Sequence, residues 1–228
     1  DLEVELVGHT ILDTPQESGR ITLPGRKLMD ICRALPDNAP IELYQEKEKA
    51  ILKSGRSRFT LTTLPSEDFP SIETQAAAQS FSLPQSELKT LLQRTVFAMA
   101  QQDVRYYLNG MLFELSNNQL RAIATDGHRM ALNTAMISID LANKKQIIIP
   151  RKGVVELLRI LEDNESNVTV TIGTNHVRIE GDTGIFTSKL IDGRFPDYQR
   201  VIPKSGDKII EVDKDTLKAA LSRTAILC

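Results

Sequence analysis

The feature that most constrains this chain is an internal repeat with a spacing of 126 residues. The sequence ITLP at 21–24 aligns with IIIP at 147–150, and the same spacing carries Gly55 onto Gly181 without a gap. A second series begins at Leu88 and recurs 129 residues later. Because a repeated pattern defines a building unit, we expect a chain assembled from copies of one small motif.

Each copy reads as a strand, a helix and three further strands. In the second copy an apolar run ends at Pro150, which suits the first turn of a helix because no N–H is needed there. The spacing of Val154, Leu157 and Leu161 then predicts a buried helical face, and alternating residues with tight turns predict antiparallel strands. Across the chain this pattern predicts helices at 24–35, 85–98, 150–161 and 213–224, and strands near 107–115, 119–124, 128–134, 168–172, 177–180 and 185–189. The expected fold class is α+β.

Two such half-units make one domain, which predicts a multidomain chain. The predicted parts are the C-terminal part of a first domain (1–72), a linker (73–79), a complete second domain (80–206) and the start of a third (207–228). The linker prediction rests on three alanines and little charge. By this count the chain lacks the first half of its first domain and nearly all of its third, so we expect a piece of a longer protein.

Positive charge is concentrated on the predicted helices. The whole chain has a net charge of −2, yet these four helices hold eleven Lys and Arg against five Asp and Glu, a net +6, and the remainder carries −8. One interpretation is that each helix simply has a solvated outer face. The other is a layer of Lys and Arg that neutralises phosphates without reading sequence, and the shared sign of all four helices favours it.

The sequence also predicts the compartment. No run approaches the roughly 20 apolar residues that would span a bilayer, and the amino terminus is acidic where a secretory signal would be basic. Cys32 and Cys228 fit neither a disulfide framework nor a metal-ligand spacing. We therefore expect a cytoplasmic protein with no membrane partner and no metal.

Four motifs resemble one known family. They are QDVRYYLNG at 102–110, ATDGHR at 124–129, PRKG at 150–153 and DGRFPDY at 192–198, and they are similar to the bacterial beta sliding clamps, the processivity subunits of DNA polymerase III. In that family three similar domains form a subunit, and two subunits close head to tail into a ring around duplex DNA. Helices line the ring and sheets lie outside. The resemblance implies a non-catalytic processivity factor with no cofactor.

The resemblance also implies two binding sites. Contacts to double-stranded and primed DNA would be made by Arg26, Gln102, Arg105, Tyr106, Tyr107, Arg151 and Lys152. Adjacent aromatic rings beside a guanidinium suit stacking on exposed bases, although Tyr107 has the alternative role of anchoring the following strand. A pocket for short apolar peptides would be formed by Leu108, Thr125, Gly127, His128, Arg129, Met130, Pro196, Arg200 and Val201. The implied peptide partners are the DNA polymerase III alpha subunit, the clamp loader delta subunit, translesion polymerases and repair factors.

The resemblance implies a third surface, at which a homodimeric ring closes in the full-length protein. Its residues would be Lys27, Ile31, Leu35, Arg56, Arg58, Phe59 and Leu61. Strand 57–61 would then be an edge strand, and Arg56 and Arg58 would guard it against indiscriminate pairing. Because the partner surface belongs to the third domain, we expect this chain alone to be a monomer.

Two other classes of protein remain as alternatives. For an enzyme, the best candidate residues are Asp126, His128 and Arg129, but the sequence has only three histidines and lacks a phosphate-binding loop or a nucleophile elbow. For a sequence-specific DNA reader, the sequence shows neither a helix-turn-helix nor a zinc-binding pattern. The sequence therefore favours the clamp.

Overall fold

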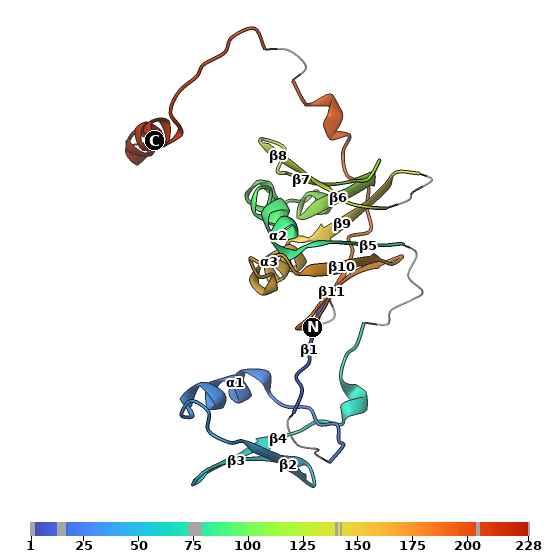
Figure 1. Cartoon of the computed structure of the whole chain (residues 1–228), viewed down its shortest axis with the longest axis vertical. Coiled ribbons are helices and arrows are strands. Elements are labelled where there is room, and N and C mark those ends of the chain that lie inside the picture. The colour runs from blue at the N-terminus through green and yellow to red at the C-terminus, as the bar shows by residue number, and fades with distance from the viewer. Residues whose placement is uncertain are drawn as a thin grey trace. The chain divides into compact units, whose positions relative to one another are not determined.

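The structure is a computed structural model that describes residues 3–12, 17–72, 79–139, 141, 143–203 and 206–227. It consists of two compact units, Asp1–Gly193 and Arg194–Cys228, and each is described by itself. Figure 1 shows the course of the chain. Within the described residues, none of the helices is long and apolar enough to cross a membrane.

The first unit contains two complete half-units of the predicted kind. The first has the elements β5 (Gln79–Pro84), α2 (Gln85–Gln93), β6 (Gly110–Ser116), β7 (Gln119–Thr125) and β8 (Met130–Met136). The second has β9 (Lys145–Pro150), α3 (Arg151–Ile160), β10 (Asn167–Ile172), β11 (His176–Gly181) and β12 (Gly184–Lys189). The predicted order of one strand, one helix and three strands is confirmed in both, as is the α+β class.

The two half-units exchange their first strands. β5 pairs antiparallel with β10, the first of the three strands in the other half-unit, and β9 pairs in the same way with β6. The sheet orders are β1-β12-β11-β10-β5 and β8-β7-β6-β9. Each half-unit therefore supplies the edge strand that completes the sheet of the other.

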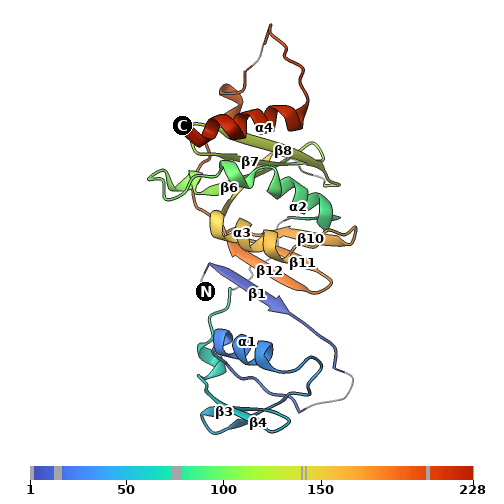
Figure 2. The same cartoon turned by 90° about the vertical axis from the view of Figure 1, so that its left-hand side faces the viewer.

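The helices α2 and α3 pack together over one face of these sheets (Figures 1 and 2). Leu88, Leu91 and Leu92 of α2 and Val154 and Leu157 of α3 are fully buried among the inward-facing strand residues. Fully burying one such side chain stabilises the fold by about 1.5–3 kcal/mol. The periodic apolar residues face the sheets, so the charged residues of both helices face away from them.

The remaining α-helix and β-strands of the first unit follow the same spacing. These are β1 (Val4–Gly8), α1 (Gly25–Ala34), β2 (Glu42–Glu46), β3 (Lys49–Ser54) and β4 (Ser57–Thr62). Adding 126 to the bounds of α1 gives those of α3, and β2, β3 and β4 fall on β10, β11 and β12 within one residue at each end. β2, β3 and β4 form a separate sheet, whereas β1 joins the sheet of β12.

Two boundaries predicted from the sequence were wrong, and segments 21–24 and 73–79 also need comment. The segment 21–24, which aligns with residues 147–150, is not a strand, because its counterpart β9 pairs with β6 and no counterpart of β6 exists among the described residues of the first copy. The helix expected to reach residue 98 ends at Gln93, and the strand expected from 107 starts at Gly110. In the predicted linker 73–79, Gln79 already belongs to β5, and residues 73–78 lie outside the described part of the chain.

The second unit contains α4 (Lys214–Thr224), which begins where the Asp213 carboxylate accepts a hydrogen bond from the Thr216 N–H. The hydrogen bonds at its end reproduce those just after α2. The Thr224 hydroxyl donates to the carbonyls of Ala220 and Leu221, just as the Thr95 hydroxyl donates to those of Leu91 and Leu92. The repeat spacing of 129 residues is therefore visible in hydrogen bonds as well as in sequence.

Candidate nucleic-acid and peptide interfaces

The helices of the structure keep the charge that the sequence predicted for them. Within their observed bounds α1, α2, α3 and α4 carry ten Lys and Arg and four Asp and Glu, a net charge of +6. Arg26 and Lys152 are exposed second residues of α1 and α3, at equivalent positions of the repeat. Neither helix has an acidic residue in its first turn, so the positive end of the helix dipole adds to these cations.

Arg151 connects α3 to the loop that follows α2. Its backbone N–H donates to the Asn109 carbonyl over 2.9 Å, and its Nη1 donates to the Met99 carbonyl over 3.4 Å. Its side chain is half-buried, unlike that of the neighbouring Lys152. Arg151 thus has a structural role beside any contact with DNA.

The loop between α2 and β6 carries the other DNA candidates. Gln102 has a φ of 56°, and Asn109 closes the loop by accepting from the Asp103 N–H and donating to the Asp103 carbonyl. Tyr106 is 56% exposed and Tyr107 is half-buried, and their rings meet edge to face with centroids 5.7 Å apart. Tyr106 therefore presents the more accessible ring, and Tyr107 contacts it edge to face.

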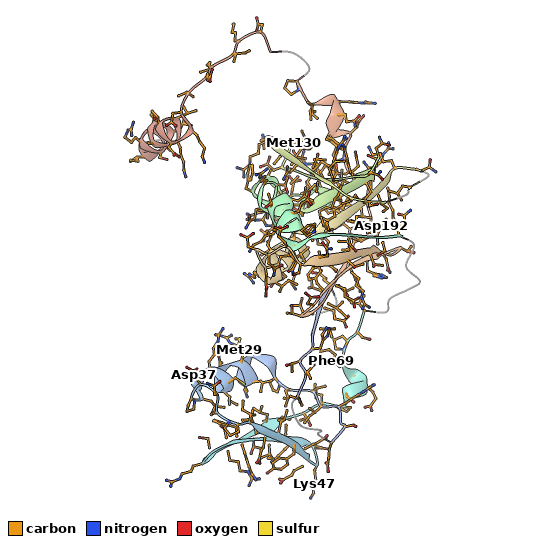
Figure 3. All side chains as sticks on the ribbon, in the orientation of Figure 1. Met29, Asp37, Lys47, Phe69, Met130 and Asp192 are labelled. Atoms are coloured by element: carbon orange, nitrogen blue, oxygen red, sulfur yellow. The ribbon has the colours of Figure 1, made fainter. Side chains whose placement is uncertain are left out.

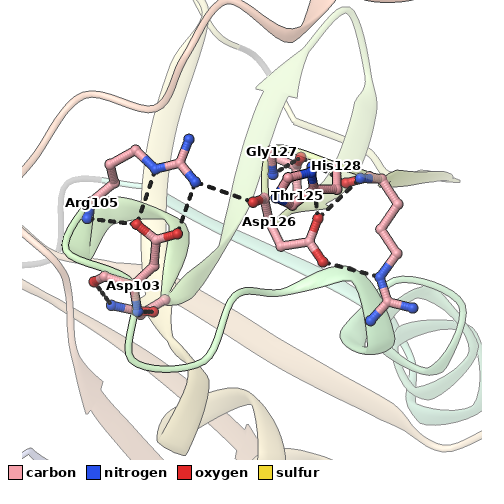
Figure 4. Close-up of polar contacts among 8 residues, drawn as sticks. Asp103, Arg105, Thr125, Asp126, Gly127 and His128 are labelled. Atoms are coloured by element: carbon pink, nitrogen blue, oxygen red, sulfur yellow. Dashed lines mark hydrogen bonds and ion pairs between the residues drawn. The ribbon is translucent and has the colours of Figure 1, made fainter.

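Arg105 is bound on two sides, as Figure 4 shows. Its Nε and Nη2 donate to the two carboxylate oxygens of Asp103, over 3.0 and 2.8 Å, and Nη2 also donates to the Asp126 carbonyl over 3.2 Å. Hydrogen bonds from the Arg105 side chain and backbone lower the pKa of Asp103 to about 2. The positive charge of Arg105 is therefore already balanced within the chain.

The turn between β7 and β8 holds the main peptide candidates. The Asp126 carboxylate accepts from the N–H groups of His128 and Arg129 and from Arg129 Nε, and these backbone bonds lower the pKa of Asp126 to about 2. The Thr125 hydroxyl donates to the Arg129 carbonyl and accepts from the Gly127 N–H. This is a compact Asx turn whose order comes from one carboxylate and one hydroxyl.

The other pocket candidates are divided between the two units. Leu108 is buried beside the start of β6, and Met130 is half-buried at the start of β8 (Figure 3). Pro196, Arg200 and Val201 belong to the second unit, where Arg200 Nε pairs with the Asp197 carboxylate at 2.9 Å. The candidates of the first unit thus lie in and directly after one turn, apart from Leu108, and those of the second lie in one short segment.

The candidates for ring closure lie on α1, directly after it, and on or just before β4. Lys27 is exposed, Ile31 and Leu35 are half-buried, and α1 buries none of its residues, as the exposed Met29 in Figure 3 illustrates. β4 is an edge of its three-stranded sheet, as expected. The remaining candidates divide by exposure: Arg56 and Arg58 are exposed, Phe59 is half-buried and Leu61 is buried. Leu61 therefore serves the interior of the chain.

Two residues that organise these sites were missed by sequence reasoning. Asp103 was not given a role, although an Asp two residues before an Arg, in a loop, is a signal for a local ion pair. Phe97 gave no signal at all; its carbonyl accepts from Arg129 Nη2 over 2.9 Å, and its ring lies under the Arg129 guanidinium. Among the described residues no group of His, Cys, Asp or Glu is arranged to hold a metal. Cys32 is exposed, and Cys228 lies outside the described part.

Comparison with known proteins gives one consistent result. Residues 82–197 match the family model described as the DNA polymerase III beta subunit, central domain, and residues 1–73 match that of its N-terminal domain. The chain is 54% identical over 227 residues to the beta sliding clamp of Pseudomonas putida, covering 100% of this chain and 62% of that protein. A beta sliding clamp from Escherichia coli is 50% identical over the same length.

Solved structures agree. A sliding clamp from Pseudomonas aeruginosa superimposes with a TM-score of 0.96 at 51% identity, covering 100% of this chain and 62% of that one. A second structure from that organism, with the same scores, is bound to griselimycin. The chain thus spans 62% of the length of these relatives. With two domain models and the fold in agreement, the chain belongs to the DNA polymerase III beta subunit family, the family of the bacterial beta sliding clamps.

Proposed function

We propose that this chain is part of a ring-shaped processivity factor that encircles duplex DNA and tethers a replicative polymerase to it. The observation that carries this proposal is the segregation of charge, with +6 on four helices in a chain whose net charge is −2. Lys and Arg on the surface of helices attract the phosphates of DNA of any sequence. A closed ring stays on DNA without stronger binding. In this role the protein is non-catalytic and works in the cytoplasm.

The DNA contacts proposed on α1 and α3 are electrostatic. Arg26 and Lys152 each stand in a first turn without acidic residues, which supports direct contact with phosphates. Binding of the full-length protein to duplex DNA should weaken steeply as salt rises, and Lys152→Ala should make that dependence shallower for every sequence. Lys189→Ala, which removes the same charge from the end of β12, is the matched control. A flat salt response in the parent protein would reject the electrostatic argument.

The peptide site is proposed around the turn between β7 and β8. The half-buried apolar side chain of Met130 and the polar groups of the ordered Asx turn directly before it support this proposal. We infer that the full-length protein binds griselimycin, as the relative from Pseudomonas aeruginosa does, and the clamp-binding peptides of the polymerase alpha subunit, the clamp loader delta subunit, translesion polymerases and repair factors. Titration of labelled griselimycin with Met130→Asp as the variant tests the site. If Met130→Asp binds griselimycin with the affinity of the parent protein, the ligand does not bind at this turn.

The subunit contact is proposed along α1 and β4. Among the described residues β4 pairs only with β3, which leaves its other edge open. The exposed Arg56 and Arg58 suit an acidic partner strand at this edge, and Arg58 also pairs with Glu46 of β2 at 3.5 Å. The 228-residue chain should then scatter light as a monomer, whereas the full-length protein should be a dimer. A stable dimer of this chain would contradict the assignment of this edge to a third domain.

A further inference from the structure

One side chain joins the loop of DNA candidates to the turn of peptide candidates. Arg105 lies in the loop between α2 and β6, and its Nη2 donates to the carbonyl of Asp126 in the turn between β7 and β8, over 3.2 Å (Figure 4). The two segments are 21 residues apart in sequence. The same Asp126 orders its turn through its carboxylate, so Arg105 is fastened to the residue on which the turn depends.

Asp103 fixes the orientation of Arg105 at the other side. Its carboxylate accepts from Arg105 Nε over 3.0 Å and from Arg105 Nη2 over 2.8 Å, and its Oδ1 also accepts from the Arg105 N–H over 2.8 Å. A fork of two parallel bonds sets the plane of a guanidinium, which a single contact does not. The fork thereby orients Nη2, which donates to both Asp103 and Asp126, toward the turn between β7 and β8.

Gly127 allows the guanidinium to lie this close to the turn. A Cβ at Gly127 would stand 3.0 Å from both Arg105 Nη atoms, closer than side chains tolerate without moving, and its φ of 87° is one that glycine favours. On the far side of the turn, Arg129 Nε donates to the Asp126 carboxylate, and Arg129 Nη2 donates to the Phe97 carbonyl. The turn is thus held between two arginines.

We propose that Arg105 is a positioning residue that fixes the turn 125–129 against the DNA-contact loop, so that ligand binding at the peptide site depends on Arg105 and Asp103 without contact from either. This inference rests on the proposed function of the two surfaces. It assigns Arg105 a role different from a simple phosphate contact, because Asp103 already balances its charge. A pure phosphate contact at Arg105 would have no effect on the peptide site.

The test compares griselimycin and duplex DNA binding by the full-length protein and four variants. Asp103→Asn, Arg105→Gln and their double variant break the fork, and Arg105→Lys keeps the charge but cannot bridge Asp103 and Asp126 together. Arg178→Gln and Glu180→Gln are matched controls, because they break another Arg–carboxylate pair whose residues are two apart in sequence. This pair lies on β11, and its Nη2 and carboxylate oxygen are 2.9 Å apart. Circular dichroism of each variant verifies the fold.

We expect each single variant of the fork to weaken griselimycin binding by about fivefold, and the double variant by no more than the worse single one, because all break the same contact. Arg105→Lys should lose griselimycin affinity while it keeps DNA affinity, a split that general loosening of the fold would not produce. Griselimycin affinity in Arg105→Gln equal to that of the controls overturns the inference. A parent protein that binds neither griselimycin nor DNA overturns the proposed function itself, and the inference with it.

Discussion

Any side chain at Gly153 is predicted to weaken the packing of α3, the helix that carries Lys152. It is buried in the first turn of that helix, where the helix lies against β12. A Cβ at this position would stand 2.5 Å from Ser188 Oγ, and 3.2 Å from both Ser188 Cβ and Ile149 Cγ2. Gly153→Ala therefore places a methyl group about 0.9 Å inside ordinary contact distance with Ser188.

The magnitude follows from two opposing effects. Ala in place of Gly in a helix stabilises it by about 1 kcal/mol. Ser188 is fully buried and its hydroxyl donates to the Lys189 carbonyl over 3.0 Å, so rotating it aside breaks a buried hydrogen bond, which costs about 1–3 kcal/mol. Ile149 and Ser188 Cβ must also yield. We expect Gly153→Ala to lower the free energy of unfolding by about 1–2 kcal/mol.

Urea unfolding followed by far-UV circular dichroism measures this, since the chain contains no Trp for fluorescence. Gly25→Ala is the matched control, because Gly25 begins α1 and a Cβ there has nothing within 4 Å. It should leave the protein as stable as before or more stable by about 0.5 kcal/mol. The reasoning fails if Gly153→Ala is as stable as the parent, because the space beside Ser188 would then accept a methyl group.

Three further predictions test other parts of the structure. Thr95→Val should lower the free energy of unfolding by about 1–2 kcal/mol, because the buried Leu91 carbonyl loses a hydrogen-bond donor. Thr224→Val, at the equivalent exposed position, should change the free energy of unfolding by under about 0.5 kcal/mol. Equal effects of the two variants in urea unfolding would refute this. The pKa of Asp126 falls from 3.8 to about 2 on folding, so the free energy of unfolding should decline as pH drops through that window. Asp126→Asn should flatten this decline. A slope of the urea midpoint against pH that is the same in Asp126→Asn as in the parent would argue against this role of Asp126. Tyr106→Ala should weaken binding of the full-length protein to primed DNA more than to blunt duplex, with Val104→Ala as the control from the same loop; equal losses on both DNAs would exclude stacking.

The order of helices and strands was predictable because the repeat shows the sequence pattern of a half-unit more than once. The agreement of α1 with α3 at a spacing of 126 residues is the clearest case. The end of α2 was not predictable, because apolar residues continue past it to Ala98; the helix stops where the Thr95 hydroxyl bonds back to Leu91 and Leu92. The exchange of β5 and β9 between half-units was also hidden, since strand pairing depends on tertiary contacts that a periodic pattern does not encode.

The candidate site shows the same division. Charge on the helices could be counted from sequence, and the exposed positions of Arg26 and Lys152 agree with that count. The hydrogen bond from Arg105 to Asp126 could not be predicted from sequence, because it joins two loops that meet only after β6 and β7 have paired. The family resemblance marked Arg105 as a DNA contact, which stays a prediction, and the structure adds that the guanidinium of Arg105 pairs with Asp103.

The central claim is that the protein holds DNA by encircling it, and residence on circular DNA tests this most directly. The full-length protein is loaded onto a nicked circle, and its dissociation is followed before and after one restriction cut that linearises the DNA. Our account predicts slow dissociation from the circle and rapid loss once free ends exist, at the same salt and with any sequence. Equal residence times on the circular and linear forms would contradict it, because a protein bound only by surface contacts does not sense DNA ends.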